Sequence, residues 1–155
     1  MFRKMRRFKQ ELTKEECLEI LNKNKRGVLS LSGFDYPYGV PLSYFYDDGI
    51  IYFHGAKEGY KLDCIKNNPK ACFTVIGQGY KKDDSWVLHF DSVMAFGNIE
   101  MVEDKEERLK ICRNIALHFT DDEDYINKEL NRSIDRVMCL KLNIEHLSGK
   151  HVKES

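Results

Sequence analysis

Features that mark several large functional classes are missing from this 155-residue sequence. Its 25 basic and 25 acidic residues cancel, and zero formal net charge argues against a nucleic-acid-binding protein held by bulk charge. No segment approaches the ~18 consecutive apolar residues that a membrane-spanning helix requires. We therefore expect neither nucleic acid nor membrane among the partners of this protein.

Common catalytic and metal-binding patterns are absent too. The sequence holds no GxGxxG or Walker pattern, no GxSxG elbow and no CxxC pair. None of the histidines outside residues 51–69 has a strong metal-ligand spacing, so we predict no metal site. The five cysteines are scattered, and all except Cys72 lie among apolar neighbours. We predict reduced, buried thiols at Cys17, Cys64, Cys112 and Cys139, in a cytoplasmic protein.

Charge gathers only at the start of the chain, where MFRKMRRFK holds five basic residues in nine. No apolar run follows it, so we do not expect a secretory signal. We predict a solvated basic arm over residues 1–10, with membrane, nucleic-acid or subunit contact as the alternatives. No repeat or linker divides the rest, which predicts a single domain over residues 1–155.

Capping and periodicity signals predict the helices. Thr13 and Glu16 form a capping box that opens a first helix, which should fade before Gly27. Asp104 and Glu107 cap a second long helix with an apolar stripe to residue 119. A short helix before Pro69 and a weaker one over residues 125–134 complete the set.

Alternating apolar residues and turn signals predict the strands. The segments are 27–33, 40–46, 50–54, 71–77, 86–102 and 136–147, with a hairpin at Asp47-Asp48-Gly49 and a bulge or bend at Gly97. Short turns between consecutive strands favour antiparallel pairing. We predict a mainly β fold with flanking helices (α+β), built as a six-stranded antiparallel barrel.

One stretch, IYFHGAKEGYKLDCIKNNP (51–69), places lysines where a helix should begin. Lys57 and Lys61 are four residues apart, so on a helix they repel each other and the positive end of the helix dipole. A bound anion, such as a phosphate, reverses both effects, and Gly55 and Gly59 let the backbone approach it. His54 can donate a hydrogen bond there. The alternative is two solvated lysines on a surface turn.

Three segments carry a family resemblance: PYGVPLSYFYDDGIIYFHGAKEGYKLDCIKNNPKACFTV (37–75), DSVMAFGNIEMVED (91–104) and EHLSGK (145–150). The sequence resembles split-barrel flavoproteins related to pyridoxamine-phosphate oxidase, in particular the nitroimidazole-resistance (Nim) branch. The resemblance implies a split β-barrel of the FMN-binding type. It also implies a homodimer with flavin at the subunit interface.

The resemblance further implies which residues contact the flavin. Lys61 matches the phosphate-binding lysine, and His54 and Gly55 end the strand beside the ribityl chain. The full predicted set for cofactor binding is Val28, Leu29 and Ser30 through their backbone, His54, Gly55, Ala56, Lys57, Lys61, Ser92, and Lys150 with its neighbour Gly149. The cofactor implied is FMN, with FAD as the alternative.

Departures from pyridoxamine-phosphate oxidases narrow the activity. Tyr60-Lys61 replaces their Arg-Lys pair, Ser32 lies near the place of a missing basic residue, and their C-terminal arginine-rich segment is absent. Vitamin B6 oxidation is therefore not expected, and His54 favours the Nim branch. The resemblance implies a flavin-dependent oxidoreductase that reduces a small electron-poor acceptor such as a nitroaromatic, with His54 as the catalytic candidate. The alternatives are a flavin-storage or sensor module, and a haem-binding split barrel with His146 or His151 as axial ligand.

Overall fold

The computed structural model describes residues 1–154, and Ser155, which ends the predicted domain, lies outside them. The helices are α1 (Lys14–Lys23), α2 (Tyr60–Asn67), α3 (Lys105–Leu117) and α4 (Glu123–Ser133), with 3-10 turns at Phe8–Gln10 and Ile134–Arg136. The strands are β1 (Arg26–Leu31), β2 (Tyr38–Ser43), β3 (Phe45–Asp47), β4 (Ile50–Ala56), β5 (Lys70–Ile76), β6 (Leu88–Val102) and β7 (Val137–Glu154).

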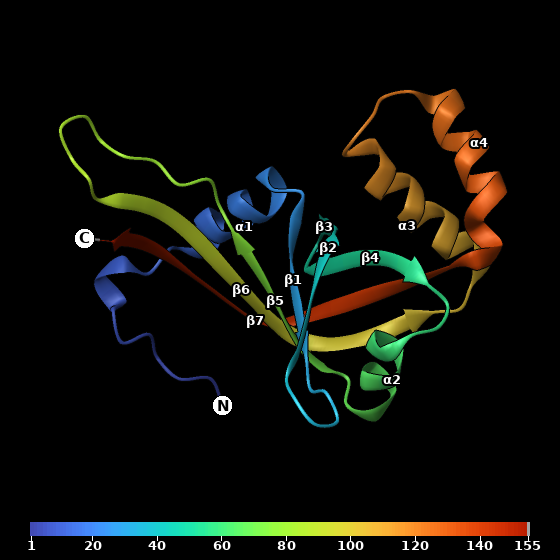
Figure 1. Ribbon diagram of the computed structural model, residues 1–155, viewed down its shortest axis with the longest axis horizontal. Coiled ribbons are helices and arrows are strands. Elements are labelled where there is room, and N and C mark those ends of the chain that lie inside the picture. Colours follow the sequence, from blue (N-terminus) through green and yellow to red (C-terminus); the bar gives the residue numbers. More distant parts are fainter. Residues whose placement is uncertain (155) are drawn as a thin grey trace.

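All strands belong to one antiparallel sheet with the order β2-β1-β5-β6-β7-β4-β3. The strands at its two ends, β2 and β3, are separated in the chain by Tyr44 alone. The sheet therefore curls into a half-barrel, with α3 and α4 packed at one end and α1 beside β6 and β7 (Figure 1). The prediction of a mainly β antiparallel split barrel with flanking helices is confirmed.

Tyr44 explains why the sheet has seven strands rather than the six predicted. Its side chain is fully buried, and its hydroxyl donates to the carbonyl of Leu21 at 2.6 Å. Its backbone N–H donates to the carbonyl of Lys25, just before β1. Pairing of the chain with β1 ends here, and from Phe45 onward the chain pairs with β4 instead. The predicted strand 40–46 is thus divided in two, although its residue pattern runs through Tyr44 without a break.

The bulge predicted at Gly97 is present between β6 and β7. Phe96 pairs with His146 and Gly97 with Ile144, which leaves Glu145 as the additional residue on β7. A Cβ atom on Gly97 would clash with the carbonyl oxygen of Asn143, so this close approach of two backbones requires glycine. Strand β7 continues to Glu154, beyond the predicted end at residue 147.

Both predicted helix caps are confirmed. The Thr13 hydroxyl accepts from the Glu16 N–H at 3.2 Å, and the Glu16 carboxylate accepts from the Thr13 N–H at 2.7 Å. The Asp104 carboxylate accepts from the Glu107 N–H at 2.8 Å. These contacts satisfy N–H groups that the first helical turn leaves without partners.

Apolar residues pack on both sides of the curled sheet. The larger cluster fills the barrel and contacts α1 and α2, and the smaller one lies under α3. The four cysteines predicted to be buried thiols are buried and free, whereas Cys72 is half-buried. Within residues 1–154, no helix is long and apolar enough to cross a membrane.

Candidate functional site

The outer face of the sheet brings four of the predicted cofactor residues together. In register, Ser92 on β6 lies between Ile76 on β5 and Lys150 on β7, and Val28 on β1 lies opposite Thr74 on β5. Because side chains alternate along a strand, these residues and Ser30 share one face, whereas Leu29 points into the barrel and is fully buried. Leu29 is therefore available to a ligand only through its backbone, as predicted.

This face is open and partly apolar. Val28, Ile76 and Met94 are 38%, 63% and 40% exposed, a pattern uncommon for neighbouring apolar side chains on a sheet. A shallow cavity of about 470 Å³ lies over β1, β2 and β5, lined by Val28, Ser30 and Ile76 among others. In ACFTVIG (71–77), alternation places Ile76 on the face of β5 opposite the buried residues, so the sequence indicates an apolar side chain on the outer face. Ile76 was not among the predicted site residues.

Lys61 and Gly55 form the second part of the site. The Nζ atom of Lys61 lies 2.8 Å from the position that a Cβ atom on Gly55 would occupy, so the lysine folds back over the end of β4. Lys61 forms no hydrogen bond or ion pair within the described part of the chain. Partial burial lowers the pKa of its ammonium group, because desolvation disfavours the charged form.

The start of α2 adds free backbone donors beside this lysine. Its N-cap residue is Gly59, with φ at 131°, and no side chain caps the first turn. The Tyr60 hydroxyl accepts from the Phe34 N–H at 3.0 Å, and its ring lies against Tyr38. These contacts hold the helix start against the loop between β1 and β2. The predicted combination of a short helix, a glycine turn and a lysine is thus present.

Two expectations about this stretch are corrected by the structure. The helix begins at Tyr60, so Lys57 lies outside it in an exposed turn, and the spacing of Lys57 and Lys61 does not place both on one helical face. His54 is exposed and follows Phe53, which points into the core. Its side chain therefore points to the face of β4 opposite that of Gly55 and Lys61. Ala56 is the last residue of β4, where it pairs with Val137, and it directly precedes this turn.

Lys150 and Gly149 are covered along one edge by the N-terminal segment. Strand β7 pairs with β4 as far as Asn143, and beyond the bulge its edge is taken by residues 11–12. The Leu12 N–H donates to the Gly149 carbonyl at 2.9 Å, and Glu11 pairs with Lys150. The side chain of Lys150 stays on the outer face, opposite Ser92.

A family model described as pyridoxamine 5'-phosphate oxidase matches residues 13–151. The chain belongs to this family. The match includes α1 to α4, β1 to β6 and most of β7, so the family assignment and the split-barrel fold agree. No curated protein matches the chain.

Solved structures of similar proteins support the same fold for this family member. A candidate 5-nitroimidazole antibiotic resistance protein from Bacteroides thetaiotaomicron shares 22% identity and a TM-score of 0.79, covering 92% of this chain and 87% of that one. A FAD-binding protein from Mesorhizobium loti shares 22% identity and a TM-score of 0.67, covering 92% and 97%. A flavocytochrome from Azotobacter vinelandii shares 18% identity and a TM-score of 0.78, covering 95% and 71%.

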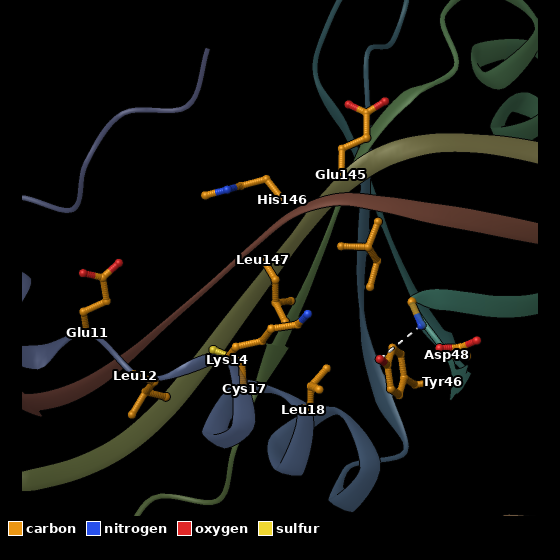
Figure 2. A pocket seen from close by; sticks show the side chains of 12 residues that line it. Glu11, Leu12, Lys14, Cys17, Leu18, Tyr46, Asp48, Glu145, His146 and Leu147 are labelled. Carbon is orange, nitrogen blue, oxygen red and sulfur yellow. Dashed lines mark hydrogen bonds between the residues drawn. The ribbon is translucent and has the colours of Figure 1, made fainter.

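A further cavity of this oxidase-family chain lies away from the predicted flavin residues. It has a volume of about 600 Å³ and is formed by α1, the turn between β3 and β4, and the bulged part of β7. Figure 2 shows Lys14, Cys17 and Leu18 on one side, Tyr46 and Asp48 on another, and Glu145 to Leu147 above them. Charges of both signs line it, and none of the predicted cofactor residues does.

Both histidines considered as haem ligands are already engaged. The ring of His146 stacks on Phe2, with centroids 4.2 Å apart. His151 Nδ1 lies 2.6 Å from the Asp91 carboxylate, and its Nε2 lies 3.3 Å from His89 Nδ1. Sequence reasoning missed this Asp91–His151–His89 chain, because Asp91 and His151 are 60 residues apart and meet only through strand register.

Proposed function

We propose that this member of the pyridoxamine 5'-phosphate oxidase family binds a flavin nucleotide and uses it to reduce a small electron-poor acceptor. The observation that carries the proposal is the half-buried ammonium group of Lys61, which has no hydrogen-bond or ion-pair partner among residues 1–154 and lies beside the uncapped start of α2. A buried cation without a counter-charge is costly. A bound phosphate removes that cost and accepts hydrogen bonds from the helix N–H groups.

The residues of the site fit such a ligand. Lys61 and the N–H groups after Gly59 suit the phosphate, while Gly55 leaves room for the lysine to approach it. The exposed apolar face around Val28 and Ile76 suits one side of a flat ring system. Ser92 and Lys150 lie in the same face and suit the polar edge of that ring. A bound flavin supplies the electron transfer itself, and the chain supplies binding and orientation.

FMN is the proposed cofactor, with FAD as the alternative. The FAD-binding and flavocytochrome structures of similar fold support a flavin without choosing between the two. The likeness to the candidate nitroimidazole resistance protein supports an electron-poor acceptor such as a nitroaromatic. His54 is exposed and forms no hydrogen bond within residues 1–154, so it is available as a proton donor on its own face of β4.

A homodimer is the second part of the proposal. Exposed apolar side chains on the outer face, Ile76 at 63% above all, favour burial against a second copy of the chain. Flavin bound on this face would then lie at the subunit interface. Sedimentation velocity should give a dimer for the native chain and a shift toward monomer for Ile76→Glu, with Ile76→Val as the control. A native monomer at micromolar concentration contradicts this part.

The phosphate anchor is tested with two ligands and two variants. FMN and riboflavin differ in the phosphate, so a flavin-fluorescence titration should show tighter binding of FMN. Lys61→Ala should weaken FMN binding roughly tenfold or more, the range of a charge-assisted hydrogen bond, and leave riboflavin unchanged. The control is Lys66→Ala, which removes a lysine at the other end of α2. Equal binding of FMN and riboflavin by the native chain would place the phosphate elsewhere.

Turnover is tested separately from binding. The protein is reduced with bound flavin and mixed with a nitroaromatic, a quinone or oxygen in a stopped-flow instrument. An oxidoreductase should reoxidise with at least one acceptor faster than free reduced flavin does. Reoxidation no faster than free flavin with every acceptor would instead support a storage or sensor module that binds the cofactor without using it.

A further inference from the structure

The basic N-terminal arm does not lie free in solvent along its whole length. The ring of Phe2 stacks on His146, with an angle of 12° between the planes, and its centroid lies 5.3 Å from that of Phe96. Phe96 on β6 and His146 on β7 are directly opposite each other in register, on the outer face. The arm therefore contacts the sheet through Phe2, which adds a third ring to this pair. The prediction of a solvated arm holds for its basic side chains, which are exposed.

The backbone that follows fixes the arm in this position. Residues 11–12 pair with the edge of β7 at Gly149 and Lys150, and the 3-10 turn at Phe8–Gln10 precedes them. The N-terminal segment consequently turns back after the 3-10 turn and lies beside β7 (Figure 1). The arm and the sheet thus form the two walls of one groove.

That groove has the size and lining of a small-molecule site. Its volume is about 450 Å³, and the residues that line it include the aromatic Phe2, Phe96 and His146, the polar Ser148, and the basic Arg3 and Lys4. Ligand clefts in proteins typically measure roughly 300–1,000 Å³ and combine aromatic walls with a few polar groups. Phe2 remains 47% exposed, so one part of its surface is available to a further ring.

The charges of the groove select for an anion. Arg3 and Lys4 form no ion pair within the residues that the structure describes. Glu11 also lines the groove, so two positive groups and one negative group give a net charge of +1 when His146 is neutral. The aromatic walls suit stacking with a flat ring, and the one excess positive charge favours a ligand that bears one negative charge.

We propose that the groove between the N-terminal arm and the Phe96–His146 pair binds a small planar aromatic molecule with a single negative charge, such as an aromatic carboxylate. The groove lies on the same outer face as the proposed flavin contacts and borders them, because Ser148 lies two residues from Lys150 on β7 and Glu11 pairs with Lys150. Phe96 and His146 lie four residue pairs along β6 and β7 from Ser92 and Lys150, which is about 13 Å of strand. The aromatic end of the groove contains none of the proposed flavin contacts, so binding there does not require flavin, but it requires that the proposed homodimer leave this end of the outer face uncovered.

The test uses the full chain and two fluorescent probes of equal shape. Naphthalene-2-carboxylate should bind saturably with one site per chain, and the neutral naphthalene-2-carboxamide should bind about fivefold more weakly. The double variant Arg3→Gln/Lys4→Gln should weaken carboxylate binding by about fivefold, the combined effect of two exposed charges. The double variant Arg6→Gln/Arg7→Gln removes the same charge from the adjacent residues, which do not line the groove, and should change affinity less than twofold.

Two further measurements distinguish binding in this groove from binding at the flavin contacts or by charge alone. Phe2→Ala, at the end of the chain where folding is least affected, should weaken binding of both probes. Prior saturation with FMN should leave carboxylate binding unchanged. Any of four results overturns the proposal. These are no saturable binding, equal binding of both probes, an equal loss of carboxylate affinity in Arg3→Gln/Lys4→Gln and Arg6→Gln/Arg7→Gln, or displacement of the carboxylate by FMN.

Discussion

Lys61 and Gly55 are adjacent in space because the α2 lysine folds its ammonium group over the end of β4. The Nζ atom lies 2.8 Å from the place where a Cβ atom would stand on Gly55. A glycine at this position thus serves to admit a cation rather than to permit a backbone turn, since its φ is not positive. The contact joins the end of β4 to the start of α2 within residues 51–69, the stretch in which the sequence predicts an anion site.

Gly55→Ala should disturb the ligand more than the fold. The added methyl group meets only the far end of a flexible lysine, so we expect a change in unfolding free energy below about 0.5 kcal/mol. FMN affinity should fall because Lys61 is displaced, while riboflavin affinity should not. In a Lys61→Ala background the same substitution should have no further effect on FMN, which a double-mutant cycle measures. Additive losses would show that the two residues act independently.

Gly97→Ala should destabilise the whole sheet. At this glycine the new Cβ atom meets the backbone carbonyl of Asn143, which cannot move without opening the bulge between β6 and β7. We expect a loss of roughly 3 kcal/mol, measured by urea unfolding at constant m-value. The control is Gly39→Ala, whose Cβ atom would lie 3.4 Å from a Val28 methyl group and should cost less than about 1 kcal/mol. Similar losses in both variants would show that the bulge accommodates a methyl group.

Local signals predicted the helices and most strands, because caps, alternation and turns act over a few residues. The capping box at Thr13 and the bulge at Gly97 are examples. The first needs a hydroxyl and a carboxylate three residues apart, and the second needs a residue without a Cβ atom. Local signals failed at Tyr44. The alternation continues through the break, and the hydroxyl contact with Leu21 that fixes the corner spans 23 residues.

The site was predicted less completely than the fold. Family resemblance selected Val28, Ser30, Ser92 and Lys150, and strand register places them on one face. The helical spacing argument for Lys57 was wrong, because α2 starts three residues later than a helix containing both lysines would need. Contacts such as Phe2 on His146 join the two ends of the chain, so no local pattern could indicate them.

Tyr44→Phe should show the strength of the corner between β2 and β3. Burial raises the pKa of the Tyr44 hydroxyl, so it remains a protonated donor to the Leu21 carbonyl at any ordinary pH. That carbonyl belongs to the last turn of α1 and lacks a helical partner. Removing the donor should cost about 1 to 2 kcal/mol of unfolding free energy. Tyr36→Phe, with a side chain 81% exposed, should stay within about 0.5 kcal/mol of the native chain.

The Asp91–His151–His89 chain should make stability depend on pH. Burial lowers the pKa of His89, and the positive neighbours Lys82, His151 and Lys153 lower it further. Asp91 accepts a hydrogen bond from Nδ1 of His151, and Nε2 of His151 faces Nδ1 of His89. When both rings are protonated, each of these two facing nitrogens carries a hydrogen, so the contact becomes repulsive. Tyr80 stacks on His89 from the neighbouring loop.

The direction follows from proton linkage. Because the pKa of His89 is lower in the folded than in the unfolded chain, the unfolded chain binds more protons as pH falls below the ordinary histidine value of about 6.5. The contribution of His89 is therefore fully present above that value and is lost progressively below it. Urea unfolding between pH 5 and 8 should show this slope, and His89→Gln should reduce it. The control is His54→Gln, which removes an exposed histidine and should leave the slope unchanged. A native slope that survives in His89→Gln would assign the pH dependence to other groups.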